Sequence, residues 1–199
     1  MLKPLCVAFA ASLLMGAGAL AEDAAPAVQS GTYGLEPIHA MVQFGVSHFG
    51  YSTYWGQFPG ATGTLVLDTA HPADSKLDVS VPIDGVITAS PKLTDELKSP
   101  DWFDAARFPA MTFKSTKVLV TGPTTADVTG DLTIHGVTHP VTLKATFTRA
   151  GVFPMNQKYM IGFDAVGHVK RSEFGVSKYV QYGLGDDVDV VISAPFERK

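Results

Sequence analysis

The sequence predicts an all-β protein, an antiparallel lipocalin-like β-barrel of about eight strands with a short helical insert. Most of the chain after residue 31 alternates apolar and polar side chains with a period of two, which is typical of half-buried strands. Gly- and Pro-containing turns separate these segments, and no helical segment alternates regularly with them, which disfavours a βαβ fold. An up-and-down barrel is favoured because closure leaves no free sheet edge; a sandwich is the alternative.

The N-terminal segment has the three parts of a secretory signal peptide. Lys3 precedes an apolar run, and Ala19-Leu20-Ala21 forms a small-residue cleavage site. We therefore expect residues 1–21 to be a signal peptide, 22–31 a flexible N-terminal lead-in, and 32–199 one exported domain. The predicted location is the periplasm.

Composition excludes several kinds of partner. Cys6 lies in the predicted signal peptide, so the mature chain would have no cysteine and no disulfide. The net charge is −4 and no basic stripe suggests nucleic acid. The hydrophobic fraction is 46% and no further apolar run is long enough for a stable membrane span, so apolar side chains must face inward. They surround either a large core or an apolar ligand.

The alternating segments define the predicted strands in order along the chain. Pro82 lacks a donor N–H, so its strand should lie at an edge or bend there. Residues 121–123 (Thr-Gly-Pro) are predicted to form a turn. The predicted strands cover residues 40–48, 64–68, 77–84, 111–116, 127–134, 141–148, 159–165 and 188–192.

One helical insert interrupts the strands. Pro91 stands at a favourable first helical position, and two leucines follow one turn apart, which predicts a helix over 91–99. The segment 99–109 is interpreted as a second helical turn that ends at Pro109. Its buried side chains are expected to be Trp102, Phe103 and Phe108.

His135 and His139 lie four residues apart, a spacing that invites a metal-site hypothesis. Gly136 and Pro140 indicate instead that the chain bends between two strands. A zinc site needs three or four converging ligands, and no spacing groups this pair with the other histidines. We predict no metal site, with His135 at the turn and outside any active site. The residues expected to face the interior here are Leu132, Ile134, Val141 and Leu143.

No catalytic constellation is visible. There is no G-x-S-x-G nucleophile motif, no cysteine in the predicted mature chain, and no Gly-rich phosphate loop between a strand and a helix. The paired acids at 95–96 and 186–187 are typical of solvated element ends. The sequence therefore predicts neither a catalytic site nor a cofactor.

Several ordered motifs resemble those of the YceI-like family, over nearly all of the chain from Thr32 onward. Tyr33 and Glu36 replace the usual Trp and Asp of the first motif. The motifs are Tyr33 to His48, Gly56-Gln57-Phe58, Trp102 to Phe113, Gly130 to Leu143, Arg171 to Gly175, and Gly185 to Val188. The resemblance implies a lipocalin-like barrel with an elongated apolar cavity that carries polyisoprenoids, prenylated quinones or fatty-acid amides. It implies no general enzyme activity and no shared catalytic or metal residues.

The resulting hypothesis is a periplasmic carrier or sequestering protein for a long apolar lipid, an isoprenoid. Aromatic side chains on the inward-facing strand positions would contact the tail, although residue type alone favours a solid core filled by these side chains. His48 or Arg171 would hold the head group, the latter by bidentate pairing with an anion. The predicted ligand-binding residues are Phe44, Val46, His48, Phe103, Phe108, Phe113, Phe163, Arg171 and Phe174.

Two other hypotheses remain open from the sequence. One is an exported metal-dependent or histidine-based enzyme. The other is a quinone-linked redox or stress-response partner of a membrane cytochrome, which would share the lipid pocket. The sequence also leaves a homodimer open.

Overall fold

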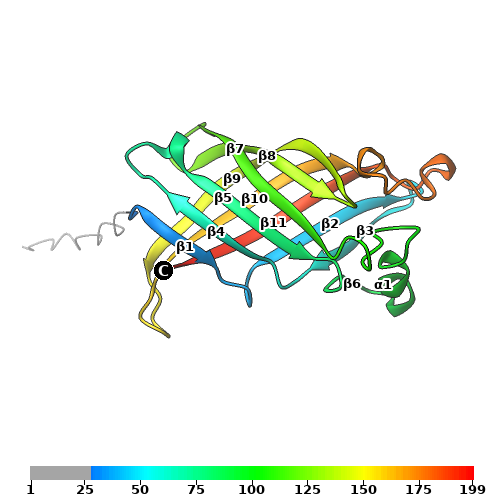
Figure 1. The fold of residues 1–199 in the computed structure, drawn as a ribbon, viewed down its shortest axis with the longest axis horizontal. Coiled ribbons are helices and arrows are strands. Elements are labelled where there is room, and N and C mark those ends of the chain that lie inside the picture. The colour runs from blue at the N-terminus through cyan, green and yellow to red at the C-terminus, as the bar shows by residue number, and fades with distance from the viewer. Residues whose placement is uncertain (1–27) are drawn as a thin grey trace, which may run out of the picture.

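The computed structural model describes residues 28–199 as one elongated antiparallel β-barrel with a single short α-helix at one end (Figure 1). The predicted signal peptide and most of the predicted lead-in lie outside the described residues. The strands are β1 Gly31–Leu35, β2 Met41–His48, β3 Ser52–Phe58, β4 Thr62–Leu67, β5 Lys76–Pro82, β6 Ile87–Thr88, β7 Ala110–Val120, β8 Thr125–Ile134, β9 Val137–Val152, β10 Tyr159–Lys170 and β11 Asp187–Arg198.

The predicted fold class is confirmed, with a ring of eight strands in the order β1-β4-β5-β7-β8-β9-β10-β11. The ring closes where β1 pairs with β11, in the register Tyr33 with Arg198 and Leu35 with Phe196. Next to β1 on the same edge of β11 lies β2, with Val46 opposite Val188. β3 and the two-residue β6 extend the sheet from β2. The first predicted strand, β2, therefore continues the barrel wall beyond β1 along the same edge of β11, and β1 is the ring strand that the periodicity missed.

The two ends of the barrel carry different structures (Figure 1). At one end, called here the helical end, lie α1 (Pro91–Leu97), β6 and the segment 171–186, which contains the 3-10 helices η2 (Arg171–Phe174) and η3 (Val180–Tyr182). At the other end, the hairpin end, lie the connections from β7 to β8 and from β9 to β10, together with η1 (Pro72–Asp74).

The helix begins as the sequence predicts. Ser90 is extended and its hydroxyl accepts a hydrogen bond from the Leu93 N–H, while Pro91 occupies the first turn, where no donor is needed. The second helical turn predicted over 99–109 does not form. Phe103 and Ala105 instead donate to the carbonyls of Leu97 and Lys98, which folds the chain back over the end of α1.

The turn between β8 and β9 is confirmed at His135 and Gly136. Both residues have positive φ, 52° and 77°, as expected of a two-residue hairpin turn. Pro140 is not part of the bend, contrary to expectation, because it lies inside β9 opposite Asp131 of β8. β9 pairs with β10 only from Lys144 onward, so Pro140 sits where one side of the strand needs no donor.

Candidate ligand-binding cavity

A cavity of about 710 Å³ runs through the barrel between its two ends. Alternate residues of the ring strands form its wall, as β11 illustrates with Val188, Val190 and Ile192. The intervening side chains of β11 face outward, because successive side chains of a strand point to opposite faces. The interior is therefore not filled by its own side chains, and the wall is almost entirely apolar.

The structure brings all but one of the predicted ligand-binding residues to the wall of this cavity. Phe108 is the exception, because its ring packs against His135 with centroids 4.8 Å apart and carries the Arg107 guanidinium over its face. The chain folds back after α1 and so turns Phe108 toward the β8–β9 turn. The predicted residues that line the cavity are Phe44, Val46, His48, Phe103, Phe113, Phe163, Arg171 and Phe174.

Aromatic rings concentrate in the wall near the helical end. Phe58 of β3 lies 5.3 Å from Phe44 and 5.5 Å from Phe103, centroid to centroid, so strand and insert meet there. Gly56 makes this possible, since a Cβ at that position would come 2.3 Å from the Phe44 ring. The interior alternation of β3 thus shapes the cavity, although the sequence reasoning did not include this strand.

Arg171 reaches the cavity wall but its donors are already used. Its Nε donates to Gly185 O at 2.7 Å, and Nη1 donates to Val176 O at 2.8 Å and Lys178 O at 3.0 Å. Nη2 donates to Leu184 O at 3.4 Å. Four of the five guanidinium N–H groups therefore hold main-chain carbonyls of one loop. Bidentate pairing with an anionic head group would require breaking these bonds, so the side chain organises the segment 171–186.

Asp186 completes this buried polar centre. Its two carboxylate oxygens accept hydrogen bonds from the Ser172 N–H at 2.9 Å and the Ser172 hydroxyl at 2.8 Å. Partial burial alone would raise the pKa of Asp186, but these bonds and the charges of Lys170 and Arg171 lower it below its ordinary value. Burial lowers the pKa of Arg171, and the nearby Asp186 charge opposes that effect.

A second polar cluster ties the segment 171–186 to α1. Glu96 Oε1 accepts from Trp102 Nε1 at 3.1 Å and from Lys178 Nζ at 3.2 Å, and Lys178 also reaches Asp101 at 3.0 Å. These hydrogen bonds lower the pKa of Glu96, and the bond from Trp102 has the largest effect. The cations of Arg171 and Lys178 both lie over the Trp102 ring, at 5.6 and 5.8 Å from its centroid.

The histidines that drew attention in the sequence do not converge. His139 Nε2 lies 3.1 Å from Glu173 O and its ring packs edge-on against Phe174, whereas His135 packs on Phe108. Neither lines the cavity, and the inward residues predicted around them, Leu132, Ile134, Val141 and Leu143, do.

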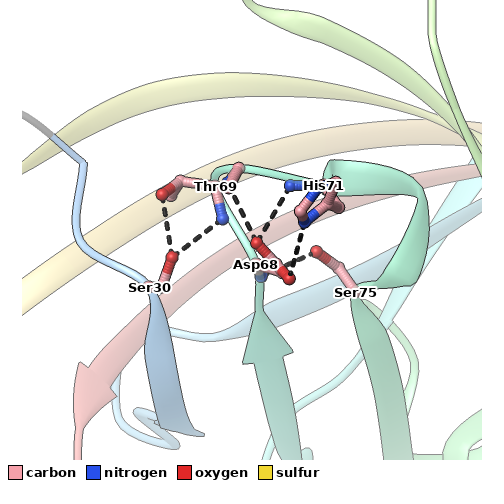
Figure 2. Close-up of polar contacts among 6 residues, drawn as sticks. Ser30, Asp68, Thr69, His71 and Ser75 are labelled. Atoms are coloured by element: carbon pink, nitrogen blue, oxygen red, sulfur yellow. Dashed lines mark hydrogen bonds and ion pairs between the residues drawn. The ribbon is translucent and has the colours of Figure 1, made fainter.

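Within residues 28–199, the geometry that could hold a metal ion occurs at Asp68, His71 and Asp74, between β4 and β5. Figure 2 shows that Asp68 already serves this loop, because its Oδ1 accepts from the Ala70 and His71 N–H groups, each at 2.9 Å. These bonds lower the pKa of Asp68. Ser30 and Ser75 hold the same loop through the Thr69 and Asp68 N–H groups. The cluster is an exposed, internally hydrogen-bonded turn.

Trp102 and Tyr54 are among the cavity residues that the sequence-based site did not include. Trp102 was expected to be buried but not to line the cavity, and Tyr54 was not assigned a role. The alternation Tyr54, Gly56, Phe58 in β3 was a usable signal for Tyr54. No local signal would have placed Trp102, because its position follows from the fold-back after α1.

Comparison with known proteins assigns this barrel to a family. The model of the YceI-like domain matches residues 33–196. The chain belongs to the YceI-like family. Protein YceI of Escherichia coli O157:H7 is 37% identical over 155 residues, which cover 78% of this chain and 80% of that protein. A UPF0312 protein of Pseudomonas syringae pv. syringae is 41% identical over 138 residues, covering 69% and 71% of the two chains.

Solved structures share the fold of this YceI-like chain. The Campylobacter jejuni YceI protein superposes with a TM-score of 0.65 at 28% identity, covering 74% of this chain and 86% of that one. Burkholderia cenocepacia BcnA gives a TM-score of 0.73 at 23% identity, covering 81% and 98%. A polyisoprenoid-binding domain from Saccharophagus degradans gives 0.62 at 14% identity, covering 86% and 100%. The last two, below 25% identity, show a common architecture.

Among residues 28–199, no helix has the length and apolarity needed to cross a bilayer.

Proposed function

We propose that this YceI-like chain binds one long apolar lipid, an isoprenoid, inside its barrel and carries or sequesters it. The observation that carries the proposal is the continuous apolar cavity, whose volume of about 710 Å³ lies in the range of small-molecule sites. A core that only had to be stable would be filled at crystal-like density. The Saccharophagus degradans domain, described as polyisoprenoid-binding, has the same architecture and supports the choice of ligand class.

The energetics favour a tail over a compact ligand. Each buried CH₂ contributes about 0.8 kcal/mol, so a C20 chain can bind tightly even after the cost of ordering it. The wall supplies many apolar contacts and few polar ones, which selects for length and apolarity rather than for a particular polar pattern. Phe44, Val46, Phe113 and Phe163 are the wall residues assigned to the tail.

A blocked cavity tests the proposal. Val190 lies mid-strand in the wall, opposite Phe44 and Gly167, and Val191 beside it points outward with 37% exposure. Val190→Trp should lower the affinity for a C20 prenyl alcohol more than tenfold, and the matched Val191→Trp should leave it unchanged. Lipids extracted from the purified wild-type protein would be identified by mass spectrometry. A wild-type protein that yields no lipid and takes up no prenyl chain would exclude carriage.

We infer export to the periplasm from the predicted signal peptide. The support is sequence-based, because residues 1–21 lie outside the described residues. Fractionation of cells and the intact mass of the purified protein test it together. A mature chain that begins at Glu22 in the periplasmic fraction is the expected result, and an uncleaved cytoplasmic chain would contradict it. A quinone-linked redox role for this chain, and its assembly into a homodimer, stay predictions.

A further inference from the structure

Tyr54 is a wall residue of the cavity that carries a polar group. It lies on the inward parity of β3 with Phe58 and stands opposite Val46 of β2. Val46 pairs with Val188 of β11, and Val188 pairs with Val169 of β10. Tyr54 thus belongs to a cross-strand row of wall residues that ends two positions before Arg171, which locates it at the helical end.

The Tyr54 hydroxyl is buried and has no hydrogen-bond partner among the described protein groups. A buried hydroxyl without a partner costs about 1–3 kcal/mol, and such groups in native proteins generally have a partner. Tyr54 lines the cavity, but protein atoms cover its hydroxyl oxygen, so a molecule in the cavity can supply the missing partner only after a shift of this side chain. After that shift the tyrosine offers one hydrogen bond to a molecule inside the barrel.

The charged side chains that line the cavity at the helical end, Arg171 and Glu96, already have hydrogen-bond partners. Four N–H groups of Arg171 hold loop carbonyls, and Glu96 accepts from Trp102 and Lys178. Lys178 is itself paired with Glu96 and Asp101. An anionic head group brought here would lose its hydration without gaining an unpaired cation, which is unfavourable in an apolar site. An uncharged oxygen needs only the one donor.

We propose that Tyr54 donates a hydrogen bond to an uncharged oxygen of the ligand head group, a hydroxyl, ether or carbonyl. The head group then lies at the helical end and the tail extends along the barrel toward the hairpin end. The inference rests on the proposed lipid binding and narrows it, because it selects neutral isoprenoids over isoprenoid diphosphates. It also replaces Arg171 and His48 as the residues expected to hold the head group.

Three C20 probes that differ only at the head distinguish these ligand classes. Geranylgeraniol has an uncharged oxygen, geranylgeranyl diphosphate is anionic, and phytane is a hydrocarbon. Dissociation constants would be measured by calorimetry on delipidated full-length mature protein, with each probe delivered from cyclodextrin. Wild-type protein should bind the alcohol more tightly than the diphosphate. Tyr54→Phe should weaken alcohol binding about fivefold, the effect of one hydrogen bond, and change phytane binding less than twofold.

Tyr51→Phe is the matched control, since Tyr51 stands at the tip of the same hairpin with its side chain 91% exposed. It should change none of the three constants. Tyr54→Phe removes no hydrogen bond to the described part of the chain, so the melting temperature of the variant without ligand should not fall. Equal weakening of alcohol and phytane, no weakening of either, or a preference for the diphosphate would each overturn the role of Tyr54 and leave lipid carriage standing. Failure of all probes to bind would overturn both.

Discussion

At the helical end of the barrel, loops and α1 pack over the strands, whereas at the hairpin end the buried hydrophobic cluster is built from the strands themselves. The helical end contains a large buried cluster that includes Trp102, Ile134 and Phe174. The hairpin end contains a smaller one that includes Tyr33 and Phe196, contributed by ring strands. The cavity lies between these two clusters and is lined by members of both.

This difference separates two ways of closing one barrel. Strand residues close the hairpin end through the same period-two alternation that builds the wall. The helical end instead depends on a polar centre, in which Arg171 and Asp186 organise a loop with little regular structure. A loop held by a few buried hydrogen bonds can carry chemistry that a strand cannot, and it fails when those bonds are removed.

The largest expected effect follows from removing the guanidinium. Arg171→Met should lower the free energy of unfolding by about 4 kcal/mol, because four main-chain carbonyls lose their donor in a site where Arg171 is only 7% exposed. Urea unfolding measures the loss.

In the same variant, hydrogen exchange should rise first in residues 171–186 while β9 and β10 stay protected. Arg171→Lys keeps the charge and should recover part of the loss. A loss below about 1 kcal/mol for Arg171→Met would show that the helical end does not depend on these bonds.

An intermediate effect is expected at the hairpin end. Phe196→Ala should lower the free energy of unfolding by about 3 kcal/mol, because Phe196 is 3% exposed and pairs with Leu35 at the closure of the ring. Hydrogen exchange should then rise across β1, β10 and β11 rather than in the loop. Phe196→Leu, which keeps most of the apolar volume, should lose about 1 kcal/mol. Faster exchange confined to residues 171–186 would contradict the separation of the two ends.

The smallest effect depends on pH. The pKa of Asp186 is lowered in the folded chain relative to about 3.9 in an unfolded one, so its carboxylate stabilises the fold above that pH. This contribution is lost as the pH falls through the folded pKa. Asp186→Asn should lower the free energy of unfolding by about 1 kcal/mol at pH 7, and the difference from wild type should shrink below pH 4.

Asp187→Asn is the matched control, since Asp187 is exposed and pairs with Lys170 at the surface. It should change stability within the error of urea unfolding, as exposed ion pairs generally do. A difference between wild type and Asp186→Asn that persists unchanged down to pH 3 would show that the two Ser172 hydrogen bonds do not favour the ionised form.

Local patterns predicted much of the wall. The alternation in β7 to β11 placed Phe113, Leu132 and Val188 on the inner face, and positive φ at Gly136 agrees with its predicted turn. Such predictions succeed because strand parity and turn conformation depend on neighbours along the chain. They failed where neighbours in space decided the outcome, as in the missed β1 and the irregular segment after α1.

The sequence by itself determined that the chain alternates, that it turns at defined glycines, and that its family motifs are those of a YceI-like barrel. Only the tertiary structure decided that the interior is hollow, because a packed core and an empty one require the same apolar side chains. It also decided which hydrogen-bond partners two polar wall residues have. The donors of Arg171 bind carbonyls that lie five to fourteen residues away along the chain, whereas the hydroxyl of Tyr54 has no partner among residues 28–199. Hydrogen-bond satisfaction depends on contacts that no sequence period encodes.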